Sequence, residues 1–355
     1  MTEMDWFEWN PKLAANLAAL LCKQGRTSES DKLVTDSISR LTLSKSERGL
    51  SMFLCELLTS LANQSSVHGF EETYQLLSRL VLESNSAYVR RQSCKAMLKA
   101  LCDMGRPSEA EALLARECSS GNASLFELRC LLEGYGRIGK FSDMERVFCR
   151  MEKTMKGQSY ETVSFNMMLG CYGDHSLIEK MTTCLRRMKT LGAPLTIRTF
   201  NSLLNSCPSL IRLLGENGSQ SPVSMNELEM ELADNERALI GELHGLVSDL
   251  DGVMTWNEFE WKLDLHGMHL ATAYVVILEW VKTMKSRLQC GETCPLQVTM
   301  VSGMGNHSDV RGESPIRRLA KGLIVRIGIP LKADRKNKGC FVAKGKVMEA
   351  WLQNS

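Results

Sequence analysis

The sequence lacks long apolar runs, and it has little proline and few aromatic residues. Its longest apolar stretch, near Tyr274–Leu278, is soon followed by Glu279, whereas a helix that spans a bilayer needs about 20 apolar residues. The 8 prolines and 26 glycines among 355 residues are too few for a low-complexity chain. Aromatic residues make up only 6% of the chain while helix-forming residues are plentiful, so the composition favours helices over a β-sandwich.

The chain also lacks an excess of either charge, since 43 basic side chains face 41 acidic ones. This balance excludes a long disordered polyelectrolyte. The charges are unevenly distributed: residues 1–225 carry a net charge of +3, residues 226–260 carry −9 and residues 261–355 carry +8. An acidic connector thus precedes a basic C-terminal domain, which indicates either a polyanionic partner or a well-solvated surface.

No CxxC motif occurs among the 13 cysteines. An odd, unpatterned set of cysteines is typical of reduced thiols in a non-secretory compartment. Cys290 and Cys294 lie close together, but no His and Cys set with zinc spacing accompanies them. We therefore predict no metal site from the cysteines.

The first ten residues do not have the composition of a targeting segment. Met1–Asn10 contains three acidic side chains, whereas organellar transit peptides are rich in Arg and Ser and poor in acids. The segment also lacks the apolar core of a secretory signal. A cytosolic protein and a mature or truncated form of a longer precursor both agree with this composition.

The first two thirds of the chain repeat with a period near 35. The segment 162–169 realigns with 197–204 at an offset of 35, which pairs Phe165 with Phe200. Related segments lie upstream at residues 132–140, 98–106 and 17–26, with a diverged copy around 53–77. A repeat of this length is the signature of a stacked repeat protein.

Each repeat contains signals for two helices. The first helix ends near a Gly followed by a basic residue, as in Gly25–Arg26, Gly105–Arg106 and Gly139–Lys140, and Gly suits a left-handed helix stop. Apolar residues at helical spacing then predict a second helix that packs between neighbouring pairs. The pattern predicts an α-helical solenoid of helix–turn–helix units.

The period, the Ser/Thr-Phe-Asn opening of a helix and the Arg-Met-Lys-Thr-Leu-Gly-Ala-Pro-Leu ending of the next helix resemble pentatricopeptide repeats. The resemblance implies about five to six degenerate repeats over 1–215, and the clearest cover 91–124, 125–161 and 162–196. It also implies binding of single-stranded RNA, with one base read per repeat by the fifth and last side chains. The candidate base-reading residues are Asn166, Thr196 and Asn201.

The other repeats fit this recognition code less well. Their fifth positions hold Lys95 and Arg129. Two interpretations stay open for these side chains: a solvated surface position or a contact with a base. The array is also short, and each base contributes only about 1–3 kcal/mol of binding. We therefore expect low sequence specificity or a partner protein.

The solenoid is expected to end near residue 215. Pro208 interrupts the last repeat or ends its helix early, and the turn-rich segment 214–222 follows. Residues 216–260 are expected to form an acidic linker with one or two amphipathic helices that cap the array. Leu243–Gly245 resembles a motif of the C-terminal domain, and we interpret this match as coincidence.

The C-terminal domain carries the candidate chemistry. The segment 261–267 predicts a short strand that enters a loop, with Leu263 and Leu265 pointing to the core and Asp264 and His266 to the other side. A carboxylate beside an imidazole can orient the ring and raise its basicity. Asp264 and His266 are therefore candidate catalytic residues.

A glycine-rich loop follows the second predicted strand of this domain. A helix over about 269–288 leads to that strand at 296–301 and then to the loop 302–308. Two glycines in the loop free the backbone amides to cradle an anion. The candidate phosphate-binding residues are Gly303, Gly305, Asn306 and Ser308. Ser314–Pro315 is expected to start another helix, and 337–343 to form a closing strand.

Three motifs in this order resemble the Smr domain: Leu-Asp-Leu-His-Gly at 263–267, Gly-x-Gly-x-His-Ser at 303–308 and Asn-x-Gly-x-Phe-Val at 337–342. The resemblance implies a small α/β Smr domain over 261–355 with a mixed four-stranded sheet. It also implies nucleic-acid endonuclease activity, with the first two motifs implicated. Met304 departs from the Arg of the fuller Thr-Gly-Arg-Gly loop, which removes a candidate phosphate contact.

The two resemblances together imply an RNA-binding protein of organellar RNA processing whose C-terminal domain cleaves RNA. In this mechanism Asp264 orients His266 as the general base, the glycine loop binds the scissile phosphate, and His307 is a candidate acid or stabiliser of the developing charge. The cofactor is unknown. No set of clustered carboxylates indicates a two-metal site, and a requirement for a divalent metal such as magnesium is open.

Two alternatives stand beside this hypothesis. One is a non-catalytic RNA-binding or scaffolding protein that supports transcript stability, translation or ribosome maturation, and the other is a scaffold for proteins alone. We expect single-stranded RNA and other RNA-processing proteins as partners, no membrane, and a monomer. The resemblance favours the chloroplast, with the mitochondrion as the alternative, and a transit peptide is not visible in this chain.

Overall fold

The computed structural model describes residues 9–117, 123–154, 162–215, 221–303 and 314–354. The chain divides into two compact units, residues 1–157 and 158–355. The domain limits predicted at residues 215 and 260 both fall inside the second unit. No helix within the described ranges has the length and apolar character that crossing a membrane requires.

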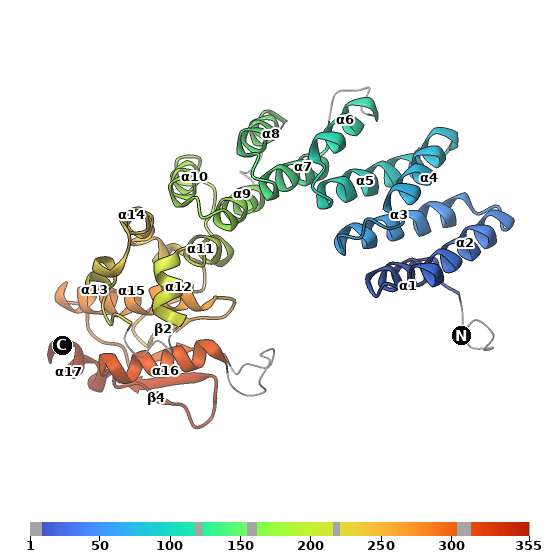
Figure 1. The fold of residues 1–355 in the computed structure, drawn as a ribbon. Coiled ribbons are helices and arrows are strands. Elements are labelled where there is room, and N and C mark those ends of the chain that lie inside the picture. Colours follow the sequence, from blue (N-terminus) through green and yellow to red (C-terminus); the bar gives the residue numbers. More distant parts are fainter. Residues whose placement is uncertain (1–8, 118–122, 155–161, 216–220, 304–313, 355) are drawn as a thin grey trace. The chain divides into compact units, whose positions relative to one another are not determined.

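The first unit consists of helices that pair in chain order (Figure 1). Their bounds are α1 Pro11–Lys23, α2 Thr27–Leu43, α3 Glu47–Asn63, α4 Phe70–Glu83, α5 Ala87–Asp103, α6 Pro107–Glu117, α7 Leu125–Arg137 and α8 Phe141–Thr154. Within each pair the two helices pack together, and α1, α3, α5 and α7 also stack on one another. This is the helix–turn–helix arrangement that the repeat pattern predicts.

Glycines end three of the four first helices of these pairs, as the sequence predicts, whereas Ser65 takes a φ of 52° after α3. Gly25, Gly105 and Gly139 have φ angles of 76°, 73° and 71°, in the left-handed region that residues with a Cβ avoid. The next N–H then closes the turn, as when Arg106 donates to the Leu101 carbonyl at 2.8 Å. This hydrogen-bond pattern satisfies backbone groups that the helix end would leave unpaired.

The second unit begins with further helices of the array and continues into the acidic segment. Their bounds are α9 Thr162–Asp174, α10 Ile178–Thr190, α11 Ile197–Leu204, α12 Pro208–Gly215, α13 Met225–Glu231, α14 Asp234–Leu243 and the 3₁₀ helix η1 Leu246–Asp249. α9 packs on α10 and α11, and α14 packs on α10. The Glu242 carboxylate of α14 accepts hydrogen bonds of 2.8 Å from Arg186 and Lys189 of α10.

His244 ties the acidic segment to the following domain. Its Nε2 lies 2.9 Å from Glu229 and its Nδ1 lies 3.3 Å from Glu279. The hydrogen bond with Glu279 is the main cause of a raised pKa for His244, and Glu229 adds to it while burial opposes it. The Leu-His-Gly segment at 243–245, which resembles the C-terminal motif, therefore supplies the histidine of a structural ion pair.

The C-terminal part of the second unit contains a mixed five-stranded sheet. The strands are β1 Met254–Trp256, β2 Glu260–Asp264, β3 Gln297–Val301, β4 Lys332–Ala333 and β5 Cys340–Lys344, in the order β1-β2-β3-β5-β4. β2 and β3 are parallel and the other neighbours are antiparallel. The prediction of four strands is wrong because β1 pairs with β2 and precedes residue 261. A strand of three residues is too short for its alternation to stand out in an acidic segment.

Apolar rows across the sheet form the core of this region. The register places Leu263, Met300 and Phe341 side by side, and all three are buried. The covering helices are α15 Leu270–Gln289, α16 Pro315–Ile327 and α17 Gly345–Asn354. β2 and β3 are parallel, and β5 is antiparallel to β3. The last residues of β2 and β3 and the first residue of β5 therefore lie side by side at the same end of the strands.

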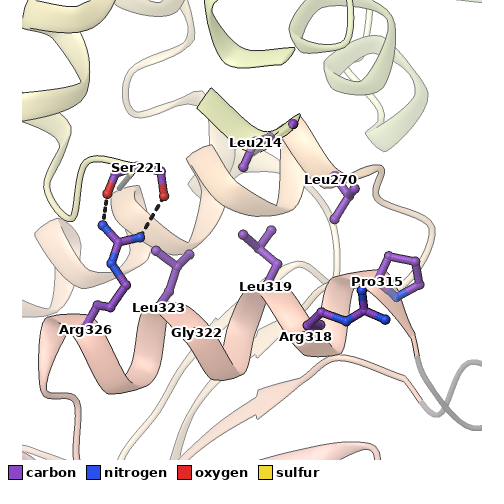
Figure 2. Close-up of a pocket in the computed structure, with 10 residues that line it drawn as sticks. Leu214, Ser221, Leu270, Pro315, Arg318, Leu319, Gly322, Leu323 and Arg326 are labelled. Carbon is purple, nitrogen blue, oxygen red and sulfur yellow. Dashed lines mark hydrogen bonds between the residues drawn. The ribbon is translucent and has the colours of Figure 1, made fainter. Parts of the chain in front are cut away.

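A pocket of about 280 Å³ lies between α12 and α16. Figure 2 shows Leu214 of α12 above Leu319 and Leu323 of α16, with Arg326 at one end. The Arg326 guanidinium donates to the Ser221 hydroxyl at 2.8 Å and also to the Ser221 carbonyl. The pocket is thus largely apolar, and its Arg326 cation is already engaged by the chain itself.

Replacing Gly345 with alanine is expected to destabilise the protein by about 3 kcal/mol. A Cβ at Gly345 would lie 1.6 Å from the Pro295 carbonyl oxygen. The Gly345 N–H also donates to the Leu296 carbonyl at 2.9 Å, so the backbone cannot move away without weakening that bond. Gly322→Ala in α16 is the matched control, because a Cβ there meets nothing within 4 Å. Urea unfolding measures both variants, and equal stabilities would contradict the predicted clash.

Candidate functional site

The end of β2 presents a carboxylate and an imidazole together. Leu263 and Leu265 are 0% and 1% exposed, whereas the side chains of Asp264 and His266 are 24% and 66% exposed. The alternation is the one that the sequence predicts. Asp264 Oδ1 accepts from the His266 backbone N–H at 3.0 Å and lies 2.6 Å from His266 Nδ1.

The charge of Asp264 determines which atom of the Asp264–His266 pair carries the shared proton. Burial disfavours the carboxylate, but the two hydrogen bonds from His266 and the nearby Lys262 ammonium outweigh burial, so the pKa of Asp264 lies below its ordinary value. Lys262 Nζ is 3.5 Å from Asp264 Oδ2. Because an ionised carboxylate only accepts hydrogen bonds, His266 Nδ1 carries the shared proton and Nε2 is left as the acceptor in the neutral ring.

The first glycine of the predicted phosphate-binding loop lies beside this imidazole. Gly303 has a φ of 71°, and a Cβ at this position would be 3.5 Å from His266 Nε2. The end of β3 therefore places Gly303 beside the imidazole nitrogen that does not bond to Asp264. The remaining loop positions of interest fall outside the described residues: Met304, Gly305, Asn306, His307 and Ser308.

The third sequence motif supports the start of the loop from β5. The Ser302 N–H and hydroxyl both donate to the Gly339 carbonyl, at 2.8 and 3.1 Å. The Asn337 side chain in turn accepts from the Gly339 N–H at 3.0 Å. The hydroxyl at position 302 thus has a structural role, which explains why a Ser preserves the loop start where the fuller motif has Thr.

The described residues contain no group of three or more His, Cys, Asp and Glu side chains that could hold a metal ion. Asp264 and His266 form a pair, and Lys262 beside them repels cations. The arrangement that the described residues offer is therefore an oriented base next to a glycine backbone.

A second candidate surface lies in the first unit, where the first helices of the pairs line a pocket of about 510 Å³. Its basic side chains are Lys12, Arg48, Lys95 and Lys99. Two aromatic rings, Tyr88 and Phe126, are 55% and 42% exposed. The Arg48 guanidinium lies 5.0 Å from the Tyr88 ring centre, and Lys95 Nζ lies 5.6 Å from that of Phe126.

The sequence analysis did not single out Tyr88 and Phe126 as candidate binding residues. Each is the second residue of the first helix of its pair, where Arg48 and Lys12 stand in α3 and α1. Aligning the repeats on this second helical position would have shown that basic or aromatic residues occupy it in successive repeats. Exposed rings next to cations are suited to stack on nucleic-acid bases and to contact phosphates.

Two of the predicted base-reading residues lie together in the second unit. The Asn166 amide donates to the Thr196 hydroxyl at 3.4 Å. Asn166 is only 6% exposed, and its Oδ1 has no hydrogen-bond partner among the described residues. A buried amide oxygen without a partner is unfavourable unless a donor reaches it, so this pair has an unused acceptor.

Asn201, the third predicted base reader, makes two hydrogen bonds inside the protein. Its amide nitrogen donates to the Gly267 carbonyl at 2.9 Å, and its Oδ1 accepts from the His269 N–H at 3.0 Å. Asn201 is 8% exposed. Its role in reading a base stays a prediction, and the structure shows that both ends of its amide already have partners.

Comparisons with known proteins identify relatives of the chain. A family model for the PPR repeat matches residues 93–116, 129–153 and 163–192, which fall within the three repeats predicted at 91–124, 125–161 and 162–196. A pentatricopeptide repeat-containing protein of Arabidopsis thaliana is 43% identical over 355 residues, covering 99% of this chain and 69% of the relative. A second protein of the same description from Arabidopsis thaliana is 30% identical over 95 residues, which is 27% of this chain and 11% of that protein.

Solved structures of the maize pentatricopeptide repeat protein PPR10 are also similar to the chain. One has a TM-score of 0.41 and 15% identity, covering 90% of this chain and 43% of that chain. Another, a complex with an 18-nucleotide psaJ RNA element, has a TM-score of 0.34 and 19% identity, covering 79% of this chain and 42% of that chain. The chain thus spans less than half of these solved structures.

Proposed function

Because the chain belongs to the pentatricopeptide repeat family, we propose that it binds single-stranded RNA and that its C-terminal domain cleaves RNA as an Smr endonuclease. One observation carries the catalytic part: Asp264 holds the His266 imidazole with its second nitrogen facing Gly303 at the start of the glycine loop. The exposed rings and cations of the first unit support the RNA-binding part.

In the proposed reaction His266 Nε2 takes the proton of the attacking hydroxyl, which is a water or the ribose 2′-hydroxyl. The oxygen attacks the phosphorus, the bond to the leaving oxygen breaks, and His307 gives a proton to that oxygen. Asp264 keeps the ring oriented and stabilises the imidazolium that forms. The backbone amides of the loop, with Gly303 beside the base, would bind the phosphate oxygens as their charge grows.

A non-catalytic RNA-binding function is the second candidate, and Met304 favours it. The loop position that holds Arg in the fuller motif carries an uncharged side chain here, so one phosphate contact is lost. In this case the same array would hold a transcript to stabilise it or to assist its translation. Cleavage assays of the full chain on single-stranded RNA, single-stranded DNA and duplex DNA separate the two candidates.

We place the protein in an organelle, in the chloroplast or alternatively in the mitochondrion. This proposal rests on the family resemblance and the plant relatives. Fluorescent fusions of the protein expressed in plant cells would test it, and fluorescence confined to the cytosol would overturn it. Other RNA-processing proteins are the expected partners, because a short array supplies few base contacts.

RNA binding is expected to weaken as salt rises, with a slope that depends on the basic residues of the array. Each phosphate contact to a single strand contributes about −0.7 to the slope of log K against log salt concentration. Arg48→Ala and Lys95→Ala, which remove cations that line the pocket, should each reduce the slope by about 0.7. Lys32→Ala in α2, on the exposed surface, is the control. If the slopes stay unchanged in both pocket variants, the phosphate contacts would be assigned to the basic C-terminal domain instead.

A further inference from the structure

We infer that Asn201 is a positioning residue for His266: α11, the helix that carries this amide, holds the turn that follows the Asp264–His266 pair. The inference rests on the proposed function only in treating His266 as the reactive group. Its structural basis is independent of any activity, because it consists of hydrogen bonds between α11 and the main chain of residues 267–269.

The turn after β2 has few supports of its own. Gly267 has a φ of 75°, and the Met268 N–H reaches the Leu265 carbonyl only at 3.3 Å. His269 then caps α15 with an extended backbone and without a side-chain cap hydrogen bond. The chain must therefore change direction over three residues immediately after His266, and small changes in this turn would move the imidazole.

Asn201 spans this turn with both ends of its amide. Its nitrogen donates to Gly267 O at 2.9 Å and its oxygen accepts from His269 N at 3.0 Å, so one planar group fixes two backbone positions. The carbonyl acceptor and N–H donor that it contacts are the same pair of groups that the Watson–Crick edge of a pyrimidine presents. An amide at the predicted base-reading position is thus paired with the protein backbone in place of a base.

Neighbouring residues of α11 strengthen the contact. The Ile197 methyl carbon Cγ2 would be 3.9 Å from a Cβ at Gly267, and the Asn205 side chain hydrogen bonds to His269 Nδ1. α11 also packs along α15. The eight residues of α11 therefore act as part of the C-terminal domain as well as of the array.

The same helix begins at the pair that is the best candidate for reading a base. Thr196 caps α11, accepting from the Thr199 N–H at 3.3 Å, and it also receives the hydrogen bond from Asn166. One short helix thus links the Asn166–Thr196 pair at its start to the turn after His266 through Asn201. The position of His266 relative to a base held by that pair is set by α11.

Two substitutions in the full chain test the assignment by separating the two hydrogen bonds. Asn201→Ala removes both, and amide hydrogen exchange at His269 is expected to become about 3- to 10-fold faster. Asn201→Asp keeps the acceptor for the His269 N–H but removes the donor to Gly267, so His269 should stay protected. Ser202→Ala, the next residue of α11, is the control and should leave exchange unchanged.

The readout that distinguishes positioning from simple packing is the NMR signal of the His266 Nδ1 proton, which the hydrogen bond to Asp264 holds. We expect this signal to shift or broaden in both Asn201 variants and to stay unchanged in Ser202→Ala. Faster exchange at His269 with an unaltered His266 signal would overturn the positioning role, as would the absence of both changes. Loss of RNA affinity for one base identity without either change would assign Asn201 to base reading.

The hydrogen-exchange and NMR measurements need neither RNA nor cleavage, so their failure is distinct from failure of the proposed function. Where the wild type cleaves RNA, the variants should lower kcat and leave KM nearly unchanged. A rise in KM alone would contradict the inference, because it would mean that Asn201 contributes to substrate binding.

Discussion

His266→Ala is expected to slow RNA cleavage by about 10²- to 10⁴-fold while RNA affinity stays nearly unchanged, which is the usual contribution of a general acid–base group. The His266 side chain is 66% exposed, so its truncation opens no core cavity and the domain should remain folded. Single-turnover cleavage and equilibrium binding, measured on the same RNA, separate the chemical step from recognition. Asp264→Asn should act in the same direction but less strongly, because the base is kept while its orientation and charge partner are weakened.

The chain offers a matched control for this experiment. His68 Nε2 lies 3.0 Å from Asp31 Oδ1, so His68→Ala breaks a similar histidine–carboxylate pair outside the site and should leave cleavage unchanged. Wild-type cleavage by folded His266→Ala would refute the assignment of the base. If the wild type cleaves neither RNA nor DNA, with or without divalent metal, the non-catalytic function is favoured and Met304→Arg becomes the informative variant.

The double variant Tyr88→Ala, Phe126→Ala is expected to weaken RNA binding by about 30-fold or more. Stacking on an aromatic side chain contributes about 1–3 kcal/mol per base, and 2 kcal/mol already corresponds to roughly 30-fold in Kd. Both rings are exposed beside cations, so their removal should affect binding far more than folding. Equilibrium titration of the full chain with a single-stranded RNA measures the effect.

Phe259→Ala is the control for the aromatic variants. Phe259 is 69% exposed and lies between β1 and β2, outside the array. Its truncation removes a comparable exposed ring and should leave affinity unchanged. Equal losses in Phe259→Ala and the double variant would mean that the array rings have no special role in holding RNA.

The repeats could be predicted from the sequence because their signals are local and recur. A Gly that must adopt a left-handed conformation, as at Gly105 and Gly139, is visible wherever it occurs. The Asp264–His266 pair was predictable for a similar reason, since alternation along one strand places both side chains on one side. The sequence predicted phosphate binding by the glycine loop, and the structure places Gly303, the first residue of that motif, beside His266.

The features that sequence reasoning missed depend on contacts between distant segments. β1 is short and gains its identity only by pairing with β2. Asn201 occupies the same repeat position as Asn166, yet 66 residues separate it from the Gly267 carbonyl that it contacts. A single sequence shows that a residue recurs at a position, but it does not show which partner the fold brings to each copy.

The two edge strands of the sheet, β1 and β4, affect how readily the protein aggregates in concentrated solution. β1 has three residues and β4 has two, and the two residues of β4, Lys332 and Ala333, are both exposed. Short edges with a charged side chain offer few free backbone groups to a strand from another molecule. The C-terminal sheet should therefore resist edge-to-edge aggregation at the concentrations that NMR requires.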